Sequence, residues 1–281
     1  MEQEEIHIRN GANFELGLVP VLKEDLFRRK VLEGCAQGAR LVNLFGCPGN
    51  NGNVQIFATL GKDQKGEIVI FSMIIPYDRP SFQSLTPDLA QAHLFEREIS
   101  EQFRITPDGH PWLKPVRYHS PQGYPFYRID GEEAHEVAVG PVHAGIIEPG
   151  HFRFQCHGEE ILNLEIQLGY QHRGIEKMME EISLERAVLL AESIAGDTVI
   201  GHVTAYCNVI ESLSDIEISP RAEAIRAIAL ELERLSNHVG DLGGLSTDIG
   251  FLPAAAYFGR LRGEFLNLLM ELSGNRYGRS L

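Results

Sequence analysis

The sequence predicts an α+β protein: an N-terminal α/β domain, then a small antiparallel β region, then a mainly helical half. A strand–turn–strand pattern with alternating and β-branched residues covers residues 53–76. Alternation returns over His135–Gly169, and from Tyr170 onward the apolar residues recur at helical spacing. A chain of 281 residues is long enough for two hydrophobic cores. We therefore expect two domains, over residues 1–125 and 126–281.

The first part of the chain carries one predicted helix and one predicted hairpin. The helix covers Leu22–Gly38 and ends before GCPGNNGN, which we interpret as a turn because no GK[ST] or GxGxxG motif is present. The hairpin joins NVQIFATLG (53–61) to EIVIFSMIIP (67–76) through the turn KDQKG. This hairpin is the clearest β-structure signal in the sequence.

A helix and a proline-rich segment follow the hairpin. The helix is predicted over Pro87–Phe103, because apolar residues recur on one face. That face comprises Leu89, Ala92, Phe95, Glu96 and Ile99. The segment Thr106–Asp130 is rich in proline, glycine and aromatic residues, which is typical of a docking strap or linker. The domain boundary near residue 125 rests on this segment.

The helical half has one well-marked helix start. Ser219 and Pro220 form an N-cap and first-turn pair, and Gly243 and Gly244 are expected to end that helix. Its apolar stripe comprises Ile225, Ile228, Leu232, Leu235, Val239 and Leu242. A further helix is expected over Tyr257–Leu272, without an obvious terminal cap.

Composition excludes several classes of function. The net charge of −14 argues against nucleic-acid binding and against direct docking on an anionic membrane surface. No apolar run approaches the roughly 20 residues that a membrane helix needs, and the acidic start MEQEEIHIRN is not a secretory signal. The four cysteines are scattered without a CxxC pair, which excludes a sequence-local metal motif and favours reduced thiols.

Candidate chemistry begins at GYQHRGIEK, Gly169–Lys177, where β structure gives way to helix. Arg173 and Glu176 are expected in the first helical turns, where the helix dipole favours a carboxylate. A buried Glu176 would be able to carry protons, whereas a capping and salt-bridge cluster is the alternative. His143 lies in the Gly- and Pro-bounded loop GPVHAG, which presents it either to a cleft or to solvent.

Two further features lie in the helices. His202 stands among small residues that allow a ligand or another element to approach closely, although a hydrogen-bonded core histidine is the alternative. Glu231, Arg234 and His238 form a polar stripe. Its ExxR spacing lacks the di-iron ExxH pattern and favours an internal ion-pair network.

Two sets of motifs resemble one family. GYQHRGIEK and ELERLSNHVGDLGGLSTDIGFLPA are similar to the large-subunit family shared by membrane-bound nickel–iron hydrogenases and the D subunit of respiratory complex I. HLFEREISEQFRITPDGHPWLKPVRY, His93–Tyr118, resembles the C-subunit signature ERE-x-x-D-x-F-G-I followed by GHP. A C-like domain ahead of a D-like domain resembles the group 4 hydrogenases, which include the hydrogenase-4 and formate-hydrogenlyase large subunits. The resemblance implies an α/β C-subunit-like domain and the N-terminal part of a D-subunit-like domain.

The sequence departs from the family pattern at several positions. Glu101 stands at the family Asp and Arg104 at the family Gly. The hydrogenase frame C-G-x-C-x-x-x-H becomes Ala195, Gly196, Asp197, Thr198 and His202 here, so the histidine is kept and both thiolate ligands are absent. Neither alanine nor threonine replaces a thiolate at a soft metal site, and the resemblance therefore implies that this chain holds no metal.

The resemblance also implies site residues for proton and quinone chemistry. Glu176 matches the RGxE glutamate that conducts protons in the family, and Arg173 matches its arginine. His143 is a candidate for the loop histidine that holds a quinone head-group, although Gly196 stands where the family has its quinone-binding tyrosine. Family members continue for about as many residues again, so we expect this sequence to be a piece of a longer one, or its remainder to be supplied elsewhere.

The implied function is that of a peripheral redox-module subunit of a membrane-bound complex of the NADH-quinone oxidoreductase type, without a nickel–iron centre. Its implied partners are an iron–sulfur small subunit with a 4Fe–4S cluster and the membrane subunits of the complex. Its implied location is the cytoplasmic face of the inner membrane. A non-catalytic scaffold and an active nickel–iron hydrogenase are the alternatives.

Overall fold

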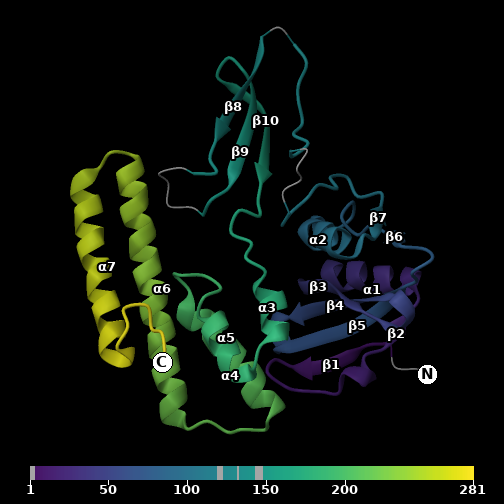
Figure 1. The fold of residues 1–281 in the computed structure, drawn as a ribbon, viewed down its shortest axis with the longest axis horizontal. Helices are drawn as coiled ribbons and strands as arrows, with labels where there is room; N and C mark the ends of the chain where they lie inside the picture. Colours follow the sequence, from purple (N-terminus) through teal and green to yellow (C-terminus); the bar gives the residue numbers. More distant parts are fainter. Residues whose placement is uncertain (1–3, 119–122, 132, 143–147) are drawn as a thin grey trace. The chain divides into compact units, whose positions relative to one another are not determined.

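The computed structural model describes residues 4–118, 123–131, 133–142 and 148–281, and the chain divides into two compact units (Figure 1). Unit 1 comprises residues 1–141 and 149–171, and unit 2 comprises residues 142–148 and 172–281. The predicted boundary near residue 125 thus lies inside unit 1, because the strap and the second β region pack together there. Among the described residues, no helix is long and apolar enough to span a membrane.

Unit 1 is built on a sheet with the strand order β1-β5-β4-β3. The predicted hairpin is confirmed, since β4 and β5 pair antiparallel in continuous register from Val54↔Ile75 to Lys62↔Glu67. β2 runs parallel to β5, and β6 pairs parallel with β7. The strands are β1 (Ile6–Arg9), β2 (Val21–Leu22), β3 (Arg40–Pro48), β4 (Val54–Lys62), β5 (Glu67–Ile75), β6 (Ser81–Gln83) and β7 (Thr106–Asp108).

Helices α1 (Glu24–Ala36) and α2 (His93–Phe103) cover one face of this sheet (Figure 1). The core between them is aromatic at its centre, where Phe27 of α1 meets Phe71 of β5 edge to face at 5.4 Å. The predicted helix over Pro87–Phe103 begins later than expected, at His93, because a short 3₁₀ helix precedes it. The 3₁₀ helices are η1 (Leu16–Leu18), η2 (Asn50–Gly52), η3 (Asp63–Lys65) and η4 (Ala90–Ala92).

The second β region of unit 1 is a three-stranded antiparallel sheet of β8 (Ala134–Val139), β9 (His151–His157) and β10 (Glu160–Gln167), in the order β10-β9-β8. This confirms the alternation that the sequence shows. The side chains of Gln155 and Glu165 are buried on one face, where they hydrogen-bond the backbone of the strap. In the part of the strap that the structure describes, the backbone at Tyr127 and Ile129 is therefore tied to this sheet.

Unit 2 consists of α3 (Ile175–Glu181), α4 (Leu184–Ala191), α5 (Val199–Leu213), α6 (Pro220–Asp248) and α7 (Leu252–Ser273). The predicted cap is confirmed, since the Ser219 hydroxyl accepts the amide of Ala222 at 3.2 Å. Helices α6 and α7 lie side by side, and Gly274, with φ 75°, supplies the terminal cap of α7. The unit 2 core gathers Ile200, Ala229, Leu266 and Leu269.

The predicted end of α6 at Gly243 and Gly244 is wrong, because the helix continues to Asp248. A Cβ on Gly243 would lie 3.4 Å from Phe258 of α7, so glycine permits the close approach of the two helices. The chain instead turns at Gly250, whose φ of 76° lies in the left-handed region. The glycines of α6 thus serve packing rather than termination.

The buried face of α6 also differs from the predicted apolar stripe. Its buried residues are Ala229, Glu233, Ser236 and Ser246, whereas Ile228 and Leu242 are 54% and 46% exposed. Small side chains face α7 because the helix pair is close-packed. Of the larger apolar side chains in the predicted stripe, Leu232 packs against the unit 2 core, whereas Ile228 and Leu242 stay exposed.

Candidate functional site

The segment that matches the hydrogenase ligand frame is the loop between α4 and α5, and its backbone is held from two sides. The guanidinium of Arg173 donates to the carbonyls of Ser193 and Ile194, the latter at 2.8 Å. The amide of Asn237, on α6, donates to the carbonyl of Asp197 at 2.8 Å. Because both contacts go to backbone carbonyls, they fix the path of the loop whatever its side chains are.

Glu233 fixes the start of α5. Its two carboxylate oxygens accept the amides of Ile200 at 2.7 Å and Gly201 at 3.1 Å. These amides belong to the first turn of α5, which has no acceptor within the helix and carries the positive end of its dipole. Burial raises the pKa of Glu233, and the two backbone hydrogen bonds oppose that rise. A Cβ on Gly201 would lie 3.4 Å from Glu233, which agrees with close approach at the small residues around His202.

His202 is held by the residue one turn before it. Its Nδ1 lies 2.8 Å from the carbonyl oxygen of Thr198 and 3.0 Å from the Thr198 hydroxyl. With hydrogen on Nδ1, the ring donates to that carbonyl and the lone pair remains on Nε2. The half-buried ring is therefore oriented through Thr198, a residue that stands where the family has a thiolate.

The donor set of this frame does not fit a nickel–iron centre. Ala195 has no donor atom, and the hydroxyl of Thr198 is engaged with His202. No three His, Cys, Asp or Glu side chains gather as a metal site within the described part of the chain. The hollow between Asp197, Glu233 and Arg262 is too small to hold a water molecule.

The other predicted site residues lie apart from this arrangement. Glu176 is in the first turn of α3, as expected, but its side chain is exposed in unit 2 rather than buried. Arg173 lies before α3, which begins at Ile175, because Gly174 has a left-handed conformation, with φ 70°, and cannot belong to the helix. Arg173 thus reaches the frame loop instead of capping α3. His143 lies outside the described residues.

The polar stripe on α6 is a surface feature. Glu231 and Arg234 form an exposed ion pair, with a hydrogen bond of 3.1 Å from Arg234 Nε, and His238 is exposed as well. The predicted internal network is therefore not internal. The sequence analysis missed Glu233, which lies two residues after Glu231 and on the buried face of α6. The signal for it is a lone carboxylate within the run of small residues Ala229, Ser236 and Gly240.

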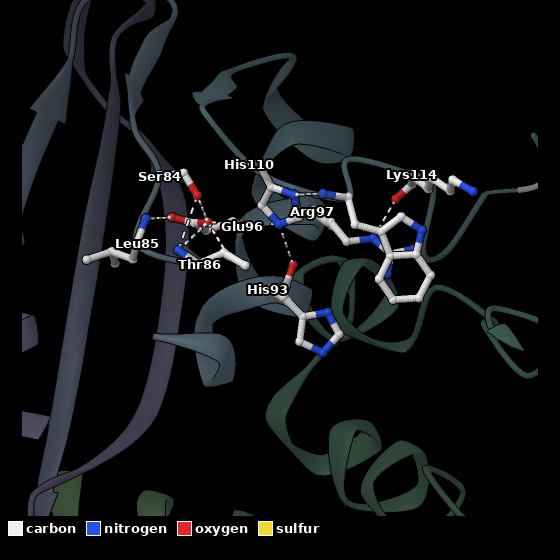
Figure 2. Close-up of polar contacts among 9 residues, drawn as sticks. Ser84, Leu85, Thr86, His93, Glu96, Arg97, His110 and Lys114 are labelled. Carbon is white, nitrogen blue, oxygen red and sulfur yellow. Dashed lines mark hydrogen bonds and ion pairs between the residues drawn. The ribbon is translucent and has the colours of Figure 1, made fainter. Parts of the chain in front are cut away.

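The C-subunit-like signature in unit 1 forms a second polar cluster, which Figure 2 shows. Glu96 is fully buried and its carboxylate accepts the Ser84 hydroxyl at 2.6 Å, the Leu85 amide at 2.6 Å and the Thr86 hydroxyl at 2.5 Å. Burial lowers the pKa of His110, although the Glu96 carboxylate 3.9 Å from its Nε2 acts in the opposite direction. Glu96 therefore ties α2 to the segment after β6.

Arg97, the next residue, holds the strap. Its Nε donates to the carbonyl of Lys114 at 2.7 Å (Figure 2). A terminal nitrogen donates to the carbonyl of Pro115 at 2.9 Å. The guanidinium also stacks 4.7 Å from the centre of the Trp112 ring. Arg97 is only 4% exposed, so these contacts replace its hydration.

The two departures from the signature have separate structural consequences. Glu101 accepts the amides of Arg117 and Tyr118, both at 2.9 Å, so a longer carboxylate still holds the strap. Arg104 occupies the C-cap of α2 in the left-handed region, with φ 57° and ψ 35°. The predicted change in this turn is therefore a strained arginine where glycine would fit without cost.

Both halves of the chain are similar to known proteins. Residues 30–128 match the family model described as respiratory-chain NADH dehydrogenase, 30 Kd subunit. Hydrogenase-4 component G of Escherichia coli (strain K12) is 30% identical over 260 residues, which cover 82% of this chain and 47% of that protein. Formate hydrogenlyase subunit 5 of the same strain is 30% identical over 277 residues, covering 87% and 49%.

A fused complex I protein and a solved structure are also similar. The C/D fusion protein of NADH-quinone oxidoreductase from Bacteroides thetaiotaomicron is 27% identical over 250 residues, covering 74% of this chain and 47% of that protein. A chain of the membrane-bound sulfane sulfur reductase, an archaeal respiratory membrane complex, superposes with a TM-score of 0.50 at 25% identity, covering 54% of this chain and 40% of that one. The chain spans about half the length of the curated relatives it matches.

The fold and the family model first define a class, a 30 Kd-subunit domain of the respiratory NADH dehydrogenase type fused to a second, helical unit. The relatives that match most of the chain then identify the family. The chain belongs to the family of complex I C/D subunits and group 4 hydrogenase large subunits. The resemblance drawn from the two motif sets is confirmed.

Proposed function

We propose that this chain is a peripheral subunit in the redox module of a membrane-bound oxidoreductase of the NADH-quinone oxidoreductase type, and that it holds no nickel–iron centre. The relatives support this, since they include C/D subunits and hydrogenase components. The observation that carries the proposal is the frame segment at residues 195–202, which comprises the end of the α4–α5 loop and the first turn of α5. Its backbone is clamped, whereas its ligand positions are Ala195 and Thr198.

A clamped loop without thiolates suits a subunit of the redox module that leaves the electron-carrying cluster to a partner. Arg173, Asn237 and Glu233 hold the backbone at both ends of the loop. Glu233 is buried, whereas Arg173 is exposed, and together the three side chains would keep a docking surface in shape after the metal ligands were lost. Electrons would then pass through a 4Fe–4S cluster in an iron–sulfur small subunit, beside which this chain docks.

The remaining partners follow from the same proposal. The complex would attach through separate membrane subunits at the cytoplasmic face of the inner membrane. A quinone head-group would have His143 as its candidate partner in this chain, and this stays a prediction because His143 lies outside the described residues. An active nickel–iron hydrogenase would need donors that Ala195 and Thr198 do not supply.

One observation favours a second candidate, a scaffold that keeps the fold for its interfaces. Glu176, the candidate proton carrier, is exposed in unit 2, and the hollow beside Glu233 has no room for water. A proton path needs a chain of such groups or waters. In the scaffold alternative, Glu176 and His202 would be dispensable for turnover.

The two candidates differ in what substitutions do to the assembled complex. Glu176→Gln and His202→Ala are introduced into the full-length chain, and the complex is purified with its partners. The redox role predicts that electron transfer from donor to acceptor falls at least tenfold while the complex keeps all of its subunits. Glu180→Gln, on the same short helix and also exposed, is the matched control and should leave turnover unchanged. Unchanged turnover in all three variants would favour the scaffold.

A further inference from the structure

Unit 1 contains a pocket of about 310 Å³ at the end of the β4–β5 hairpin. Its apolar wall includes Val54, Ile75 and Phe103. Tyr77, which is 77% exposed, and Arg104 also line it, as do Gly52, Pro76, Pro80 and Ile105. The volume is at the lower end of the range for small-ligand sites, so it suits one compact group.

The backbone at Arg104 is held in a conformation that arginine disfavours. Its φ of 57° places it in the left-handed region, and its amide donates to the carbonyl of Ser100 at 2.9 Å to close α2. Glycine adopts this conformation without steric cost, whereas any side chain crowds the backbone. Strain of this kind persists only where the surrounding structure fixes the conformation, and residues that carry it cluster at functional sites.

The pocket wall carries a positive charge, although the chain as a whole is acidic. Arg104 is the one charged residue of the pocket wall, and within the described ranges its guanidinium has no hydrogen bond or ion pair. The chain as a whole carries a net charge of −14, so anionic groups are plentiful elsewhere. Arg97, on the same helix, is by contrast fully engaged with the strap.

We propose that this pocket binds an apolar carboxylate, with the carboxylate on Arg104 and the apolar body against Val54, Ile75 and Phe103. A guanidinium presents two parallel N–H donors that match the two oxygens of a carboxylate. The apolar wall contributes burial, and the exposed ring of Tyr77 offers a flat face at the opening. The carboxylate would belong either to a small organic acid or to the free carboxyl end of a polypeptide with an apolar last residue.

Binding is measured by titration calorimetry and ligand-observed NMR on the full chain, with N-acetyl-leucine as the probe. N-acetyl-leucinamide has the same apolar body without the charge and is the matched ligand control. Arg104→Gln removes the charge and keeps a side chain of similar length. Arg29→Gln is the matched protein control, because Arg29 is an exposed arginine on α1 in the same unit.

The proposal expects N-acetyl-leucine to bind at least tenfold more tightly than the amide, and Arg104→Gln to abolish that preference. Arg29→Gln should change the affinity less than twofold. Equal binding of acid and amide, an unaffected Arg104→Gln variant, or no binding of the acid up to about 10 mM would overturn it. A pentapeptide ending in leucine separates the sources: tenfold tighter binding than N-acetyl-leucine supports a polypeptide end, and equal affinity supports a small acid.

Discussion

Glu233 accepts the amide of Ile200 at 2.7 Å, so the first turn of α5 is capped by a carboxylate from a different helix. A helix start normally finds its acceptor in the residue just before it, yet Thr198, at the N-cap, makes no side-chain cap bond. Together with the contact from Asn237 to the carbonyl of Asp197, this carboxylate positions His202 relative to α6. This contact links the frame loop to the helix pair of unit 2.

The first prediction concerns the pH dependence of that contact. Because burial raises the pKa of Glu233 above 4.5, the folded chain binds more protons than the unfolded chain between 4.5 and the raised pKa. Stability of the wild type relative to Glu233→Gln should therefore fall as pH rises through that window. Urea unfolding from about pH 3 to 8 measures the difference and also covers the window of the control below.

The matched control has the opposite sign. The hydrogen bond from Arg234 lowers the pKa of Glu231 below 4.5, so the wild type should gain stability relative to Glu231→Gln as pH rises toward 4.5. The two residues stand on the same helix, one buried and one exposed. Curves of the same sign for both variants would contradict this account of Glu233.

The second prediction separates two glutamates of the signature helix. Glu96→Ala should destabilise unit 1 by roughly 3 kcal/mol or more, since it leaves several buried donors without an acceptor. Glu98→Ala removes a partly exposed ion pair of 3.1 Å with Arg117 and should cost less than about 1 kcal/mol. Thermal unfolding checks both, and similar losses would show that the cluster in Figure 2 is not the anchor of α2.

The third prediction concerns the strained C-cap. Arg104→Gly should stabilise the chain by about 0.5–1 kcal/mol, because relief of the left-handed strain exceeds the added entropy of the unfolded chain. Gln102→Gly, within the same helix, should instead destabilise by about 1 kcal/mol. Denaturant midpoints distinguish the two, and a destabilised Arg104→Gly variant would mean that Arg104 contributes contacts that offset its strain.

The fourth prediction restores the thiolates. In the double variant Ala195→Cys, Thr198→Cys, the frame regains two soft donors beside His202, and the hydroxyl that engages His202 Nδ1 is removed. This variant should bind Co²⁺ with a thiolate charge-transfer absorption, whereas the wild type should show none. If the double variant folds without binding Co²⁺, the clamped loop does not retain the geometry of a ligand frame.

Much of the fold was predictable because it rests on local patterns. The β4–β5 hairpin and the Ser219 cap follow from alternation and from cap chemistry within a few residues. The predicted α6 stripe was right only in part: Leu232 packs against the core, but close helix pairing buries small residues, and no local pattern in α6 says which face α7 will take. Gly243 looks like a stop signal until its partner Phe258 is known.

The sequence predicts which residues make up the candidate site, but not which contacts they make. The resemblance supplied Arg173, Ala195, Thr198 and His202, but it did not reveal that Arg173 binds the carbonyl of Ile194. Nor did it reveal Glu233, whose partners are backbone amides about thirty residues away. A backbone partner carries no side-chain signal, so such contacts emerge only in the folded chain.

The metal content of the assembled complex tests the central claim most directly. The full-length chain is purified with its partners, nickel and iron are quantified by mass spectrometry, and hydrogen evolution is assayed on the same sample. With Ala195 and Thr198 at the ligand positions, we predict iron from partner clusters, no stoichiometric nickel and no hydrogen evolution. One nickel per complex together with hydrogen evolution would contradict the account.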